Sequence, residues 1–117
     1  MSTKFNIDII KGSRYLKGFI YQDSTKTPID LTGIDARMHI RERENSPAPE
    51  IELTTTNGRL TIIGASGQIN IVLTAQETEG LTINNGVYDL ELYDAGDPDI
   101  VDTILEGAVT VTEGITR

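Results

Sequence analysis

The stretch Asn85-Gly86-Val87-Tyr88-Asp89-Leu90-Glu91-Leu92-Tyr93 shows most clearly how this chain folds. Tyr88, Leu90 and Leu92 occupy every second position, and acidic side chains stand between them. Successive side chains of a strand point to opposite faces of its sheet, so this period of two predicts a β-strand with one buried face. The preceding Asn85-Gly86 pair is typical of the end of a turn.

The same alternation continues on both sides of this stretch. Apolar residues recur at every second position in five further segments, which are residues 5–9, 36–40, 51–53, 60–62 and 69–73. Residues 99–112 are rich in Ile, Val and Thr, and Gly107 within them predicts a bend or bulge. The chain therefore predicts one all-β domain over residues 1–117, an antiparallel β-sandwich of about 7–9 strands.

Turn residues separate these segments. Asn57-Gly58 predicts a tight hairpin between residues 51–53 and 60–62, because this pair readily adopts positive φ angles. Gly64-Ala65-Ser66-Gly67 predicts a further turn, and the two prolines of residues 44–49 predict a loop.

One segment has the signature of a helix. Thr74 can cap the N-terminus of a short helix, and Glu77 stands three residues later at the capping-box position. Gly80 can end this helix. We therefore expect one short helical turn near residues 75–80.

The tyrosine of the opening stretch adds a finer expectation. Gly86-Val87-Tyr88 resembles a corner of immunoglobulin-like domains, in which a tyrosine hydroxyl ties back to the preceding loop. Leu90 stands where a disulfide-bonded domain of that class carries a cysteine. The resemblance implies an immunoglobulin-like antiparallel β-sandwich.

Composition narrows the functional classes. The net charge is −8, which disfavours nucleic acid as a partner, because phosphate contacts need clustered Lys and Arg. Residues 1–75 carry nine Lys or Arg against eight Asp or Glu, whereas residues 76–117 carry one against ten. There is no cysteine, no apolar run long enough to cross a bilayer and no signal-peptide pattern at the N-terminus, so we expect a soluble protein made in a cytoplasm.

No catalytic motif is evident, and the chain predicts no enzyme, no cofactor and no metal ion. His39 is the single histidine and has no evident catalytic partner in sequence. Asp94, Asp97, Asp99 and Asp102 could hold calcium, but Asp94-Ala95-Gly96-Asp97-Pro98 is first of all a turn sequence. The chain has no phosphate-binding glycine loop and no nucleophile elbow.

Two segments are candidate contact surfaces. Tyr15-Leu16-Lys17-Gly18-Phe19-Ile20-Tyr21 has apolar side chains on both faces of a strand. Either both faces are buried, or the aromatic residues Tyr15, Phe19 and Tyr21 face a partner, which is the interpretation favoured here.

The second segment carries Arg37, His39, Arg41 and Arg43 at alternate positions, which predicts a basic stripe on one strand face. Pairing with acids on neighbouring strands is the more ordinary role for such a stripe, and a docking surface is the alternative.

Several short segments occur in a characteristic order, among them Thr27-Pro28-Ile29-Asp30-Leu31-Thr32-Gly33, Gly67-Gln68-Ile69-Asn70-Ile71, Val87-Tyr88-Asp89-Leu90-Glu91-Leu92 and Glu106-Gly107-Ala108-Val109-Thr110-Val111. In this order and spacing they resemble a family of small phage and prophage structural proteins, and the N-terminal domain of phage baseplate upper proteins. The resemblance covers about residues 5–117. It implies a virion part near the tail or baseplate, present in several symmetric copies among other phage proteins. A capsid decoration protein and a receptor- or carbohydrate-binding module are the alternatives, and the lack of Trp counts against the latter.

Overall fold

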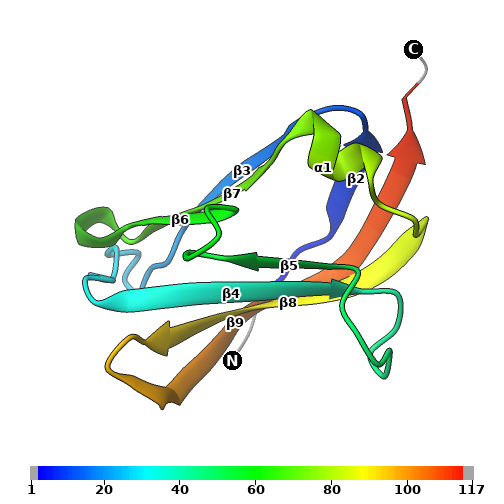
Figure 1. The fold of residues 1–117 in the computed structure, drawn as a ribbon. Coiled ribbons are helices and arrows are strands. Elements are labelled where there is room, and N and C mark those ends of the chain that lie inside the picture. The colour runs from blue at the N-terminus through cyan, green and yellow to red at the C-terminus, as the bar shows by residue number, and fades with distance from the viewer. Residues whose placement is uncertain (1–2, 115–117) are drawn as a thin grey trace.

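Two β-sheets packed face to face make up the part of the chain that the computed structural model describes, residues 3–114 (Figure 1). The strands are β1 (Thr3–Lys4), β2 (Ile7–Lys11), β3 (Tyr15–Ile20), β4 (Ile34–Arg41), β5 (Ile51–Thr54), β6 (Leu60–Ile63), β7 (Gln68–Leu73), β8 (Asn85–Asp94) and β9 (Asp97–Glu113). A 3-10 turn, η1 (Gly64–Ser66), joins β6 to β7, and a short helix, α1 (Ala75–Glu79), follows β7.

The strand order defines the fold class. The larger sheet has the order β1-β9-β8-β4-β5, and β2 continues along the edge of β9 where β1 ends. The smaller sheet has the order β3-β7-β6. These orders match the G-F-C-C′ and B-E-D strands of immunoglobulin domains, here with the N-terminal strand running parallel to the last one. The predicted immunoglobulin-like β-sandwich is therefore confirmed.

The core lies between the two sheets and consists mainly of Ile, Leu and Val. The alternation of β4 and β8 places Met38 and Leu90 on this inner side, where both are almost fully buried. Each fully buried side chain of this size contributes about 1.5–3 kcal/mol. Packing of Leu90 thus fills the position where a disulfide-bonded domain of the same fold class would carry a cysteine.

The hairpin predicted at Asn57-Gly58 is wrong. β5 pairs with β4 in the larger sheet, whereas β6 pairs with β7 in the smaller one, so the chain changes sheets between them. Gly58 does adopt a positive φ of 81°, but the Asn57 side chain instead accepts hydrogen bonds from the backbone N–H groups of Thr54 and Arg59. These bonds hold a crossover loop.

The bulge expected at Gly107 lies elsewhere. Leu90 pairs with Leu105 and Glu91 with Thr103, so Ile104 is the extra residue of β9. Gly107 serves a different purpose, because a Cβ atom there would overlap the backbone carbonyl of Phe5. The close passage of the N-terminal segment therefore requires glycine at this position.

The short helix is confirmed in its detail. Thr74 and Glu77 form the reciprocal capping box, and Gly80 is the C-cap. Buried Thr78 fixes the helix to the β2–β3 turn: its hydroxyl accepts from the N–H of Gly12 at 3.1 Å and lies 2.9 Å from the carbonyl oxygen of Ser13.

The tyrosine corner has a different partner from the one expected. The Tyr88 hydroxyl donates to the carbonyl of Phe5 on the N-terminal segment, not to the loop that precedes β8. This follows from the strand order, because β1 and β2 run along β9, the neighbour of β8.

Candidate functional site

The aromatic residues of β3 do not form an outward patch. Tyr15 and Phe19 stand opposite buried Leu73 and Ile69 of β7, and directly opposed residues share a face of the sheet. Together with Tyr21 they are half-buried and pack against the core. The interpretation of Tyr15, Phe19 and Tyr21 as a surface facing a partner is corrected accordingly.

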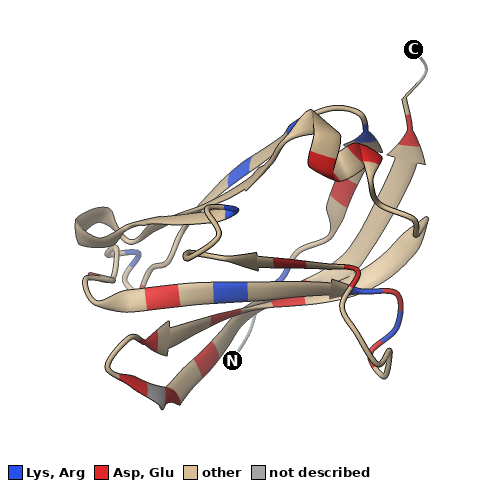
Figure 2. Ribbon diagram, viewed as in Figure 1, with Lys and Arg blue, Asp and Glu red and all other residues tan. Residues whose placement is uncertain are grey.

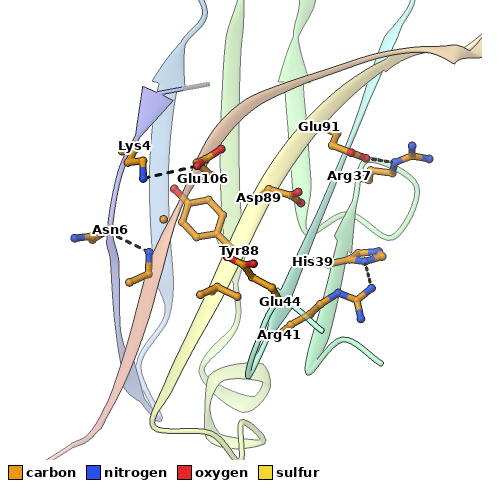
Figure 3. A pocket seen from close by; sticks show the side chains of 13 residues that line it. Lys4, Asn6, Arg37, His39, Arg41, Glu44, Tyr88, Asp89, Glu91 and Glu106 are labelled. Atoms are coloured by element: carbon orange, nitrogen blue, oxygen red, sulfur yellow. Dashed lines mark hydrogen bonds and ion pairs between the residues drawn. The ribbon is translucent and has the colours of Figure 1, made fainter. Parts of the chain in front are cut away.

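The outer face of the larger sheet carries a hollow of about 620 Å³ across β4, β8 and β9 (Figure 3). Most of its lining is charged or polar. The lining residues, termed the polar hollow below, are Lys4, Asn6, Arg37, His39, Arg41, Glu44, Val87, Tyr88, Asp89, Glu91, Glu106, Gly107 and Ala108. Three of the four residues of the predicted basic stripe lie here.

Cross-strand pairing organises the basic side of the hollow. Arg37 of β4 donates through Nε to a carboxylate oxygen of Glu91 on β8 at 2.7 Å, and its guanidinium lies 4.9 Å from the ring centre of Tyr93. The guanidinium is therefore held between a carboxylate and a ring.

His39 is held in one tautomer by its neighbours. Its Nδ1 lies 3.2 Å from an Arg41 nitrogen and its Nε2 lies 2.8 Å from a Glu52 oxygen. Because a guanidinium only donates, we assign Nδ1 as the acceptor and Nε2–H as the donor to Glu52. Both ring nitrogens are thus occupied, and neither contacts a hydroxyl that it could activate as a nucleophile.

The acidic side of the hollow centres on Asp89, which stands opposite His39 on β4 and Glu106 on β9. Burial raises the pKa of the Asp89 carboxyl above its usual range, and the neighbouring charges of Glu91 and Glu106 raise it further, against the opposing effect of His39 and Arg41. Lys4 approaches Glu106 at 4.0 Å. The hollow therefore holds ordered charges of both signs side by side.

Arg43 does not belong to the stripe. β4 ends at Arg41, and the backbone N–H of Arg43 donates to the Ser46 hydroxyl within a turn. The backbone N–H of Ser46 in turn donates to the carbonyl of Arg43 at 3.0 Å, so the chain turns back here and β4 ends before Arg43.

The aspartates near residue 94 act in the turn between β8 and β9. Asp94 accepts from the N–H of Gly96 at 2.8 Å, and Asp97 accepts from the N–H of Asp99 at 3.2 Å. Within residues 3–114 no group of three or more His, Asp or Glu side chains is arranged to hold a metal ion.

The outer face of the smaller sheet differs completely from the polar hollow, and sequence reasoning missed it. Its outward side chains, termed the amide–aliphatic face below, are Leu16, Gly18, Ile20, Thr61, Ile63, Gln68, Asn70 and Val72. None is charged, and Figure 2 shows the acidic residues of the sheets on the other layer. The sequence signal was present in β3, where Leu16 and Ile20 alternate with the inner aromatics.

The chain matches no protein-family model and no curated protein. Among solved structures it is similar to the extracellular domain of the voltage-gated sodium channel beta4 subunit, at 15% identity and a TM-score of 0.47, covering 98% of this chain and 96% of that one. A second structure of sodium channel beta subunits matches at 12% identity and a TM-score of 0.47, covering 95% and 92%. No helix among the described residues is long and apolar enough to span a membrane.

Proposed function

We propose that this chain is a non-enzymatic structural protein of a bacteriophage virion, a tail- or baseplate-associated adaptor that acts through protein–protein contacts in several copies. The resemblance of residues 5–117 to small phage structural proteins and to the N-terminal domain of baseplate upper proteins supports the virion part of the proposal. The immunoglobulin-like sandwich is the fold which that resemblance implies.

One observation carries the protein-contact part of the proposal. The two outer sheet faces differ in kind: one bears the polar hollow with its paired charges, and the other bears no charge at all. An adaptor must hold two different neighbours, and two chemically distinct faces provide for that. The polar hollow lacks a polarised nucleophile, which supports a binding role over a catalytic one.

The alternatives are less well supported by the hollow. A carbohydrate-binding module needs aromatic rings on which a sugar can stack, but the aromatic residue lining the hollow is Tyr88, whose hydroxyl is bonded to Phe5 and whose ring is buried. A capsid decoration protein would use the same kinds of contact, so its location in the particle separates it from the proposed function.

Mass spectrometry of purified particles, with tails separated from heads, tests the proposal. We expect the protein in tails at a fixed ratio to baseplate proteins. Recovery on heads would replace the tail assignment with capsid decoration. Absence from both fractions, in particles whose other structural proteins are detected, would overturn the virion proposal.

A further inference from the structure

We propose that the amide–aliphatic face is the site at which a second copy of this chain docks, through a twofold-symmetric contact of two smaller sheets. This deepens the proposed function, on which it rests for its biological setting, by naming one partner of the adaptor. The contact itself is a property of the isolated chain.

The face concentrates exposed apolar side chains. Among the described residues five large hydrophobic side chains are about half exposed, and three of them, Leu16 (55%), Ile20 (54%) and Ile63 (48%), lie here. Val72 stands opposite Leu16 on the neighbouring strand and adds to the apolar area. Exposed apolar side chains gathered on one flat sheet face are typical of an interaction site, whereas single ones need no explanation.

The charge distribution selects a second copy as the occupant. β6 and β7 contain no charged residue (Figure 2). The one charge in β3, Lys17, lies on the inner side over the rings of Phe5 and Phe19. In a chain of net charge −8, this face is where two identical copies can meet without opposing carboxylates. A charged partner would instead lose its hydration here without gaining an ion pair.

The pattern across the face is self-complementary. Cross-strand register puts Leu16 beside Val72 at one end and Ile20 beside Gln68 and Ile63 at the other. A twofold axis lying in the plane of the contact, across the strands near their centre, would bring two such faces together, exchange these ends and place apolar side chains against apolar side chains. Sheets packed in this way interdigitate at a spacing of about 10 Å.

Two amides in the middle of the face provide matching hydrogen bonds. Asn70 accepts from the Gln68 side chain at 3.0 Å and lies over Gly18, where a Cβ would be 2.9 Å from its Oδ1. Within the described residues, the Asn70 NH₂ group and the Gln68 side-chain oxygen form no hydrogen bond. The NH₂ group is a donor and the oxygen is an acceptor. The free Asn70 NH₂ of one copy can therefore donate to the free Gln68 oxygen of the other, and the reverse.

Sedimentation equilibrium of the full 117-residue chain, up to millimolar concentration, tests the inference. We expect a monomer–dimer equilibrium. Ile20→Glu and Asn70→Asp should each raise the dimer dissociation constant by about tenfold or more, since each places a charge in the contact. Asn70→Asp keeps a side-chain oxygen that can accept the hydrogen bond from the Gln68 amide. The dimer of this variant should return at acidic pH, where the new carboxyl is protonated and uncharged.

Ile100→Glu is the matched control. Ile100 is as exposed as Ile20, at 56%, but lies on β9 in the other sheet, so this variant should dimerise like the original chain. The inference would be overturned if the original chain stayed monomeric at every concentration. It would also be overturned if Ile100→Glu raised the dimer dissociation constant as much as Ile20→Glu does. Melting curves followed by circular dichroism identify any variant that fails to fold. Dimerisation in solution does not depend on particle location, so the two proposals fail separately.

Discussion

The Tyr88 hydroxyl donates a hydrogen bond of 2.5 Å to the backbone carbonyl of Phe5, which lies 83 residues earlier in the chain. Around this bond the N-terminal segment crosses β9 at Gly107, and the Asn6 side chain accepts from the N–H of Ala108 in place of a backbone partner. The bond therefore connects β8 to the segment between β1 and β2 across the intervening strand.

Removal of that hydroxyl should weaken the fold at neutral pH. Tyr88→Phe leaves the ring in the core but deprives the Phe5 carbonyl of its donor, and we expect a loss of about 1–2 kcal/mol in the free energy of unfolding. Urea denaturation at pH 7 measures it. Equal midpoints for the two proteins would show that water replaces the bond without cost.

The same tyrosine predicts a loss of stability at high pH. Burial, with a smaller effect of Tyr15, raises the pKa of Tyr88 from 10.0 to about 12. The folded state thus holds the proton more tightly than the unfolded state, so this contribution is complete below pH 10 and disappears as the pH rises through about 12. Unfolding free energies measured across this window should fall more steeply for the original protein than for Tyr88→Phe.

Gly107→Ala should detach the N-terminal strands. The added methyl group would overlap the carbonyl of Phe5, which is backbone and cannot turn away, so we expect a loss of about 1–3 kcal/mol. Gly80→Ala is the control, because its new Cβ would meet its nearest neighbour at an ordinary 3.6 Å. Hydrogen exchange of β1 and β2 should accelerate in the first variant only; unchanged exchange in Gly107→Ala would contradict this account.

Thr78→Val should loosen the contact between α1 and the β2–β3 turn. The change keeps the buried volume but leaves the N–H of Gly12 and the carbonyl of Ser13 without their partner, at a cost of about 1–3 kcal/mol. Thr78→Ser retains the hydroxyl and should lose less stability. Thermal melts compare the two variants. If Thr78→Val unfolds at a higher temperature than Thr78→Ser, the hydroxyl is not what fixes the helix.

Glu77 should contribute to unfolding by acid. The backbone N–H of Thr74, and then the side chain of Arg59, hold the pKa of the Glu77 carboxyl below its usual value of 4.5. Its stabilising effect is therefore complete above that value and is lost as the pH falls through the lower pKa of the folded state. Glu77→Gln should flatten the acid limb of a stability–pH curve, and parallel curves would exclude this role.

Exchange of two charges separates binding from folding in the polar hollow. Arg37 and Glu91 are partly exposed, at 39% and 28%, so their ion pair contributes less than about 1 kcal/mol to stability. The double variant Arg37→Glu with Glu91→Arg keeps the pair and the net charge but reverses the local field. We expect near-normal melting and reduced incorporation into particles; full incorporation would exclude the hollow as a charge-directed contact.

Local patterns in the sequence determined the strands of residues 36–41 and 88–92, the capping box of Thr74 and Glu77, and the all-β class. Each follows from neighbours a few residues apart: a period of two sets the face of each side chain, and a cap needs only its own turn. The polar hollow was predictable in part, because the alternation of Arg37, His39 and Arg41 puts them on one face.

The tertiary structure decided the features that depend on distant partners. Asn57-Gly58 can form a turn both in a hairpin and in a crossover between sheets. The pairing of β5 with β4 and of β6 with β7 is what places the two strands in different sheets. β3 has apolar side chains on both faces, and packing against the core turned Phe19 inward and left Ile20 exposed. Periodicity states which side chains share a face, but the free energy of burial, summed over both sheets, selects the face that meets the core.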